Sequence, residues 1–169
     1  MSTLNRKIAK PTTAITNKPI PTTMKQNNDY IFETVMEVRD YECDIEGIVN
    51  NANYLHYTEH TRHLFLKKCG LSFAEMHLKG EDAVVARMNL QYKTPLRCDD
   101  VFVSKMGLRK EGIKYVFQHD LYRLSDNKLS FRATVDLVCL VNGKLAASSG
   151  YDKMLEYNGN TIDIQEEGK

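Results

Sequence analysis

The segment from Asn51 to about Cys69 constrains the fold more than any other part of the sequence. Asparagine is a strong helix N-cap, because its side-chain oxygen accepts a hydrogen bond from a free N–H of the first turn. Gly70 suits the position just past a helix end, and Lys67 and Lys68 suit the last turn. We therefore predict one long helix, whose three- and four-residue spacing is carried by Tyr54, Tyr57, Thr58, Thr61, Leu64, Phe65 and Lys68.

Strands are predicted on both sides of this helix. From Phe32 to Arg39 the side chains alternate, mostly with a period of two, which is typical of a strand. After a short helix over Ser72–Leu78, turn residues divide the rest of the chain into strands. Because one curled antiparallel sheet can bury a single helix against its face, this order predicts an α+β domain. The later strands are predicted at Ala83–Lys93, Asp100–Arg109, Ile113–Leu124, Lys128–Val141 and from the Asn142-Gly143 turn to about Leu155.

The two ends of the chain differ from this central part. Residues 1–28 contain five basic residues, no acidic residue and three prolines, which argues against a packed element. We predict a disordered extension over residues 1–29, and its composition also suits a transit peptide or a start at Met24. Residues 158–169 are predicted to form a polar tail, so that the folded domain spans residues 30–157.

Composition excludes several functional classes. A net charge of +1 over 169 residues argues against a dedicated nucleic-acid-binding domain, which is usually clearly basic. No apolar run is long enough to span a bilayer. The four cysteines form no C-x-x-C pair and no signal-peptide pattern precedes them, so we expect free thiols in a reducing compartment. The expected location is cytoplasmic, or a plastid or another organelle if the first residues are a transit peptide.

The residues with chemical potential lie directly before the long helix. Glu42, Asp44 and Glu46 alternate along the chain and are followed by Gly47, which permits a tight turn. Such a turn brings Asp44 over the helix start, where free N–H donors and the positive end of the helix dipole stabilise negative charge. A carboxylate beside such donors is the minimum equipment for acyl transfer. An aspartate in a loop also commonly caps its own turn, and this simpler role for Asp44 stays open.

The same stretch resembles a known family. The pattern aromatic–acid–x–Asp–x–x–Gly–Ile–Val, followed by Asn-Tyr and later an arginine, is similar to the 4-hydroxybenzoyl-CoA thioesterase type of hotdog-fold enzymes. The letters V-R-D-Y-E-x-D and V-N-N-A most resemble the plant acyl-lipid thioesterases, and the similarity extends over about Phe32–Leu145. The resemblance implies a single hotdog domain, in which an antiparallel sheet wraps around one central helix. It also implies hydrolysis of acyl-CoA or acyl-ACP, without a metal or organic cofactor, by a homodimer or homotetramer.

The resemblance further implies roles for individual residues. Asp44 falls on the family's catalytic aspartate, which acts as general base or as nucleophile. Asn51 falls where the family uses a backbone N–H to polarise the thioester carbonyl. Glu59 is a second catalytic candidate, because some relatives carry their acid on the central helix. The residues expected to contact the substrate are Gly47, Ile48, Val49, Asn50, Asn53 and Tyr54.

Two other functional classes fit parts of the sequence. A non-catalytic hotdog protein would bind acyl thioesters without turnover. A zinc hydrolase would use the H-x-x-E-H pattern of His56, Glu59 and His60, in which the two histidines share a helix face. A zinc site needs a third protein ligand, and no downstream residue stands out as that ligand. A solvated, histidine-rich helix face is the simpler interpretation of this pattern.

Overall fold

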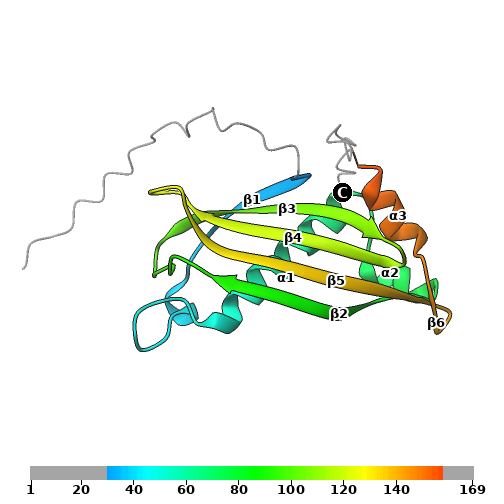
Figure 1. The fold of residues 1–169 in the computed structure, drawn as a ribbon, viewed down its shortest axis with the longest axis horizontal. Helices are drawn as coiled ribbons and strands as arrows, with labels where there is room; N and C mark the ends of the chain where they lie inside the picture. Colours follow the sequence, from blue (N-terminus) through cyan, green and yellow to red (C-terminus); the bar gives the residue numbers. More distant parts are fainter. Residues whose placement is uncertain (1–29, 158–169) are drawn as a thin grey trace, which may run out of the picture.

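The computed structural model describes residues 30–157. The predicted disordered extension (1–29) and polar tail (158–169) lie outside these residues. Within the described part, the longest helix, α1 (Asn51–Lys68), lies across one face of an antiparallel sheet (Figure 1). No helix in this part is both long enough and apolar enough to cross a membrane.

The sheet has five strands in the order β1-β3-β4-β5-β2, and a sixth, β6, pairs with β5. All of these pairings are antiparallel. The strands and helix predicted up to Val141 are confirmed, with ends shifted by at most two residues. The remaining elements are β1 (Phe32–Glu37), α2 (Phe73–Leu78), β2 (Glu81–Tyr92), β3 (Val101–Glu111), β4 (Lys114–Arg123), β5 (Lys128–Val141) and β6 (Lys144–Ala146).

The segment after the Asn142-Gly143 turn differs from the prediction. Strand β6 ends at Ala146, and the chain then forms helix α3 (Ser149–Leu155). The Ser148 hydroxyl oxygen accepts a hydrogen bond from the Tyr151 N–H at 3.2 Å, as expected of a serine N-cap. The prediction of a strand to Leu155 was therefore wrong, because it continued the hairpin through a helix cap.

The face of the sheet that contacts α1 is buried in two apolar clusters. One cluster includes Phe65, near the C-terminal end of the helix, and the other includes Tyr54, near its start. Buried polar residues separate the clusters along the helix: Thr61 is fully buried, and Arg62 Nη1 lies 3.3 Å from His119 Nε2. The helix is therefore held against the sheet along most of its length.

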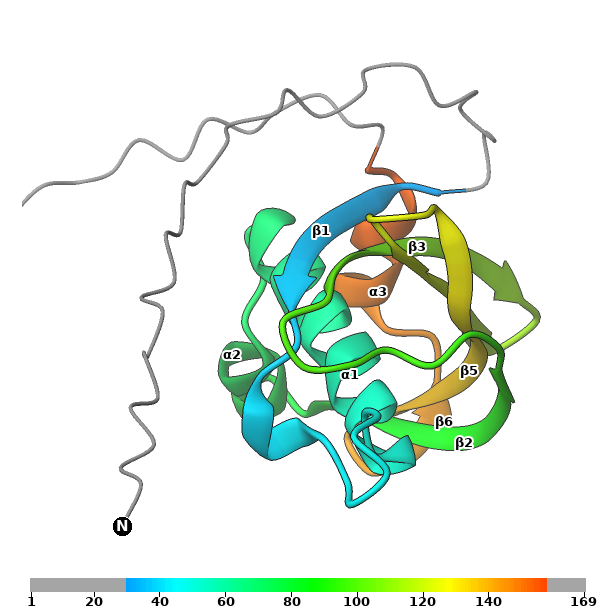
Figure 2. The same ribbon diagram turned by 90° about the vertical axis from the view of Figure 1, so that its left-hand side faces the viewer.

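The start of α1 lies at one end of the curled sheet, as the end-on view in Figure 2 shows. The short 3-10 helix η1 (Asp40–Glu42), the loop that follows it and the connection between β2 and β3 gather at the same end. Helix α3 lies at the opposite end (Figure 1). The fold thus places the predicted chemistry at one end of the domain.

Candidate active site

Asp44 lies in a tight turn directly before α1. Its main-chain N–H donates to the carbonyl of Ile48 at 2.9 Å, and its own carbonyl accepts from the Gly47 N–H at 3.0 Å. Gly47 has a φ of +68°, a left-handed conformation that glycine adopts without steric cost. The predicted turn is therefore present, and the helix cap Asn50 follows it within three residues.

The two oxygens of the Asp44 carboxylate are in different situations. Oδ1 accepts hydrogen bonds from the N–H groups of Glu46 at 3.1 Å and Ile48 at 3.4 Å, which is the usual capping role of a loop aspartate. Oδ2 accepts no hydrogen bond from any residue between 30 and 157. The side chain is half-buried. One oxygen thus holds the carboxylate in place, while the other is available to a ligand.

The first turn of α1 also has an unused hydrogen-bonding group. The Asn50 side-chain oxygen accepts from the Ala52 N–H at 3.0 Å. The Asn51 N–H, by contrast, has no acceptor in the described part of the chain, as is common for the first N–H groups of a helix. The Asn51 carbonyl is fixed by the Tyr92 hydroxyl at 3.2 Å. This start of α1 therefore offers a free donor and the positive end of the helix dipole to an anionic group.

Glu42 connects the Asp44 turn to α1. Its main-chain carbonyl accepts from the Asn50 N–H at 2.9 Å and from Asn53 Nδ2 at 2.7 Å. Its buried carboxylate accepts from the Tyr57 hydroxyl at 2.7 Å. From the sequence, Glu42 was only one of three alternating carboxylates. No helical or strand spacing relates it to a residue fifteen positions later, so its partner could not be predicted.

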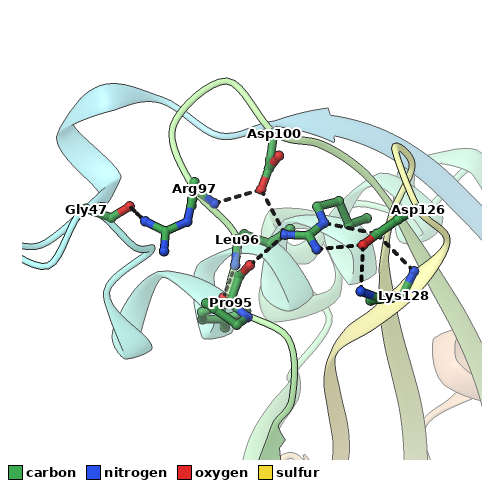
Figure 3. A network of polar contacts seen from close by, with 9 residues as sticks. Gly47, Pro95, Leu96, Arg97, Asp100, Asp126 and Lys128 are labelled. Atoms are coloured by element: carbon green, nitrogen blue, oxygen red, sulfur yellow. Dashed lines mark hydrogen bonds and ion pairs between the residues drawn. The ribbon is translucent and has the colours of Figure 1, made fainter.

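The connection between β2 and β3 supports the Asp44 turn from another side. The Leu96 carbonyl accepts from the Val49 N–H at 2.9 Å, and the Leu96 N–H donates to the Tyr54 hydroxyl at 3.0 Å. The Arg97 guanidinium donates to the Gly47 carbonyl at 3.2 Å, as Figure 3 shows. The turn is therefore fixed between α1 and this connection.

Arg123, at the end of β4, anchors the same connection to the sheet. Its guanidinium donates to the Pro95 carbonyl at 3.1 Å and to both Asp126 oxygens at 3.0 and 2.7 Å. Asp100 joins the two arginines, because its Oδ2 accepts from the Arg97 N–H at 2.8 Å and lies 3.6 Å from Arg123. The hydrogen bonds from Arg123 hold the pKa of Asp126 well below its usual range.

All six predicted substrate-binding residues have structural partners, and Gly47, Ile48 and Asn50 take part in the hydrogen bonds of the turn and the helix cap. Val49 and Tyr54 are 3% and 4% exposed and belong to the apolar cluster at the helix start. The Tyr54 ring stacks on Phe131 with 5.1 Å between the ring centroids. The Asn53 amide is bound to the Glu42 carbonyl. These side chains support the turn and the helix start, and their direct contact with a substrate stays a prediction.

Glu59 and the histidines lie on the outer face of α1. His56, Glu59 and His60 are all exposed, and Glu59 lies ~12 Å along the axis from Asn51 at the usual helical rise. Burial lowers the pKa of Arg62, and the negative charge of Glu59 partly opposes this. Between residues 30 and 157, no group of three or more His, Cys, Asp and Glu side chains is placed to hold a metal ion. The zinc-hydrolase alternative therefore finds no third ligand there.

Cys43 is the other potential nucleophile beside Asp44. Burial raises the pKa of its thiol, and the charges of Asp44 and Glu42 add to this effect, while the Cys98 main chain opposes it. Because the thiolate is the reactive form of cysteine, this environment works against a nucleophilic role for Cys43.

An open groove of about 1190 Å³ runs beside the junction, between β1, η1 and α1. Its lining includes Glu42, Asn53 and Tyr57, but neither Asp44 nor Asn51. The free carboxylate oxygen and the free N–H therefore do not open into this groove.

Comparison with known proteins identifies the family. The family described as the Thioesterase-like superfamily matches residues 38–157, which include the Asp44 turn and all of α1. The chain belongs to this superfamily.

Individual relatives cover different shares of their own length. The acyl-acyl carrier protein thioesterase ATL3 of Arabidopsis thaliana, named as chloroplastic, is 34% identical over 97 residues, which are 57% of this chain and 51% of that protein. The putative acyl-CoA thioesterase YneP of Bacillus subtilis is 31% identical over 112 residues, 66% of this chain and 80% of that protein. The matched region spans only about half the length of the first of these relatives.

Solved structures confirm the fold. A hypothetical protein from Aquifex aeolicus superposes with a TM-score of 0.64 at 28% identity, over 69% of this chain and 91% of that one. A 1,4-dihydroxy-2-naphthoyl-CoA thioesterase from Synechocystis gives a TM-score of 0.69 at 15% identity, over 73% and 94%; this second likeness concerns the fold alone. The predicted α+β hotdog domain is confirmed.

Proposed function

We propose that this protein hydrolyses acyl thioesters to a carboxylic acid and a thiol, with Asp44 and the Asn51 N–H as the reacting groups. One observation carries the proposal. In a loop–helix junction where most polar groups are hydrogen-bonded, the Asp44 Oδ2 and the Asn51 N–H have no partner among residues 30–157. The first can act on water or on a carbonyl carbon, and the second can donate to the carbonyl oxygen.

The chemistry follows one of two routes. As a general base, Asp44 takes a proton from water, the oxygen attacks the thioester carbon, and the proton passes to the sulfur as the C–S bond breaks. As a nucleophile, the Asp44 carboxylate attacks the carbon itself, forms an anhydride and releases a thiolate, which takes a proton from water; a second water then cleaves the anhydride. In both routes the Asn51 N–H stabilises the negative oxygen. Water and these two groups suffice, so no metal or organic cofactor enters either route.

The substrate class is an acyl group on a thiol carrier, either coenzyme A or acyl carrier protein. The names of the Arabidopsis and Bacillus relatives support one carrier each. Glu59 is too far along α1 to share one carbonyl with the Asn51 N–H, which leaves Asp44 as the proposed acid.

We also propose that two copies associate through β2. This strand is one of the two outer strands of the sheet, and Val84, Val85 and Met88 on it are each more than a third exposed. A long apolar edge strand is a favourable surface for association. Because Tyr92 at its end contacts Asn51, the partner would lie beside the proposed site.

Light scattering of the wild-type protein is expected to give the mass of a dimer or tetramer. Met88→Lys is expected to shift this mass toward that of a monomer. A monomeric wild-type protein would contradict the proposed association.

The function is tested by turnover of acyl-CoA and acyl-ACP substrates of different lengths by the wild-type protein and by Asp44→Asn. We expect hydrolysis by the wild type and a loss of at least ~10²-fold in kcat for Asp44→Asn. Glu46→Gln is the matched control, because Glu46 is an exposed carboxylate in the same turn, and it should retain turnover. Full activity of Asp44→Asn would refute the proposed role, and thioester binding without turnover by the wild type would favour the non-catalytic alternative.

A further inference from the structure

We propose that Glu42 is a positioning residue, which holds the Asp44 turn in register with the first two turns of α1. The inference rests on the proposed function, because it concerns how Asp44 and the Asn51 N–H are kept facing the same substrate. It is carried by two separate sets of contacts, one made by the main chain of Glu42 and the other by its side chain.

The main-chain carbonyl of Glu42 is bound to the start of the helix. It accepts from the N–H of the cap residue Asn50 at 2.9 Å and from the side chain of Asn53 at 2.7 Å. One donor residue, Asn50, directly precedes Asn51, and the other, Asn53, follows it by two positions. The Glu42 carbonyl is thereby hydrogen-bonded to a residue before Asn51 and to a residue after it, so the main chain just before Asp44 is fixed to the start of α1.

The carboxylate of Glu42 reaches further along the helix. Its Oε2 accepts from the Tyr57 hydroxyl at 2.7 Å and from the Arg39 N–H at 2.8 Å, and its Oε1 accepts from the Arg39 guanidinium at 3.2 Å. The side chain is only 8% exposed. Burial of a carboxylate is costly unless it is hydrogen-bonded and paired with a cation, and here both conditions are met.

These contacts fix the position of Glu42 both along the axis of α1 and around it. Tyr57 lies six residues after Asn51, which is ~9 Å along the helix axis. A residue bound at Asn50, Asn53 and Tyr57 can neither slide along α1 nor rotate about it without breaking a hydrogen bond. Burial and the neighbouring carboxylate raise the pKa of Tyr57, so its hydroxyl stays protonated and continues to donate. Asp44 itself takes no part, and its Oδ2 stays free.

The opposite end of the domain contains a chemically similar arrangement that serves as a control. The Tyr115 hydroxyl donates to Asp152 Oδ1 at 2.7 Å, and Lys110 Nζ donates to the same oxygen at 2.6 Å. Tyr115 is fully buried, as Tyr57 nearly is. This second tyrosine–carboxylate–cation group lies on α3 and the neighbouring strands, away from the start of α1. Tyr57→Phe and Tyr115→Phe each remove a hydroxyl that donates to a carboxylate, and Tyr115→Phe also removes the contacts of this hydroxyl with the Ser148 main chain at 3.1 Å.

The experiment compares Glu42→Gln and Tyr57→Phe with Tyr115→Phe, using thioester kinetics, thermal unfolding and amide hydrogen exchange of residues 43–48. We expect Glu42→Gln and Tyr57→Phe to lower kcat by ~10- to 10²-fold, the scale of effect that a small misplacement of reacting groups produces. KM should change much less, because no group that touches the substrate is altered. Exchange of the Asp44 turn should accelerate in both variants. Tyr115→Phe should lower the Tm without changing kcat or the exchange of this turn.

The outcomes separate this inference from the proposed function. If Asp44→Asn abolishes turnover while Glu42→Gln and Tyr57→Phe keep the wild-type kcat, Glu42 is not a positioning residue and the proposed function stands. If the wild-type protein hydrolyses no thioester, the proposed function fails, and hydrogen exchange still decides the structural part of the inference: unchanged exchange of residues 43–48 overturns it. If Glu42→Gln does not fold, Tyr57→Phe, which removes the hydroxyl that donates to the Glu42 carboxylate, decides alone.

Discussion

The two helix starts, at α1 and α3, are built from the same elements but use them differently. Each begins with a side-chain cap, Asn50 in α1 and Ser148 in α3. At α3 a carboxylate completes the cap: Glu81 accepts from the hydroxyls of Ser148 and Ser149 at 2.5 and 2.6 Å and from the Gly150 N–H at 3.3 Å. At α1 no carboxylate of residues 30–157 accepts from the N–H groups of the first turn, although Asp44 lies in the turn just before it. A helix start whose N–H groups are bound to a carboxylate is structural. The start of α1 has an N–H without an acceptor among residues 30–157, and the turn before it has an aspartate oxygen without a donor there, so these two groups are available to a ligand.

The sequence around each start explains the difference. The first turn of α1 contains no acidic residue, so no side chain of that turn competes for the Asn51 N–H or repels an anionic oxygen there. The first turn of α3 contains Asp152, and Glu81 approaches it from the beginning of β2. Asp44 could fill the same role at α1, but its Oδ1 is held by the N–H groups of its own turn. The turn therefore keeps the carboxylate near the helix without closing the site.

The largest predicted effect is that of Asn51→Pro at the start of α1. Proline at the corresponding first position of α3 serves as its comparison. Proline at the first position of a helix removes an N–H that has no helical partner, and its fixed φ suits the helix. Asn50, at φ −57° and ψ 137°, has the extended conformation that a residue before proline needs. Asn51→Pro should therefore lower kcat by ~10²–10³-fold through loss of one oxyanion donor, with little change in Tm. Steady-state kinetics and calorimetry measure both.

Two variants control this prediction. Asn51→Ala keeps the backbone N–H and should retain most of the activity. Ser149→Pro makes the same change at the first residue of α3, where it removes a hydroxyl bonded to Glu81; it should cost about 1 kcal/mol of stability and leave kcat unchanged. Equal kinetic losses in Asn51→Pro and Asn51→Ala would show that the backbone N–H is not the important group.

A smaller effect is predicted in the acid stability of the α3 end. The hydroxyls of Ser148 and Ser149 lower the pKa of Glu81, and burial opposes them only partly. An unfolded glutamate has a pKa of about 4.3, so the stabilisation is fully present above that pH and is lost as the pH falls through the lower folded pKa. Between pH 5 and 3 the Tm of the wild type should therefore fall more steeply than that of Glu81→Gln. Parallel Tm curves would show that Glu81 is not the responsible group.

Much of the fold was predictable because it depends on local patterns. The spacing of Tyr54, Tyr57 and Phe65 located α1, and the strands up to Val141 followed from alternation and turn residues. The turn at Gly47 was also predictable, because a short acidic loop before a helix cap needs such a residue. Each of these features is determined by neighbours within a few positions.

The parts that could not be predicted depend on contacts between distant residues. Glu42 finds Tyr57 and Asn53 only once η1 has folded against α1, and no periodicity relates these positions. The local cap of α3 at Ser148 was overlooked, and the support that Glu81 gives to this cap comes from 67 residues earlier in the chain. The β2–β3 connection is held by Arg97 and Arg123, which in the sequence resemble ordinary surface charges. The helix and the turn of the candidate site could thus be predicted from neighbouring residues. The polar contacts that hold them together join residues far apart in the sequence and could not.

The central claim is that the Asn51 N–H donates to the carbonyl of a thioester held at Asp44. It is tested most directly by the infrared stretching frequency of a ¹³C-labelled thioester carbonyl bound to Asp44→Asn, which should bind substrate with little turnover. A hydrogen bond from Asn51 should lower this frequency relative to the same thioester bound to the double variant Asp44→Asn/Asn51→Pro. An identical frequency in the two complexes would contradict the claim.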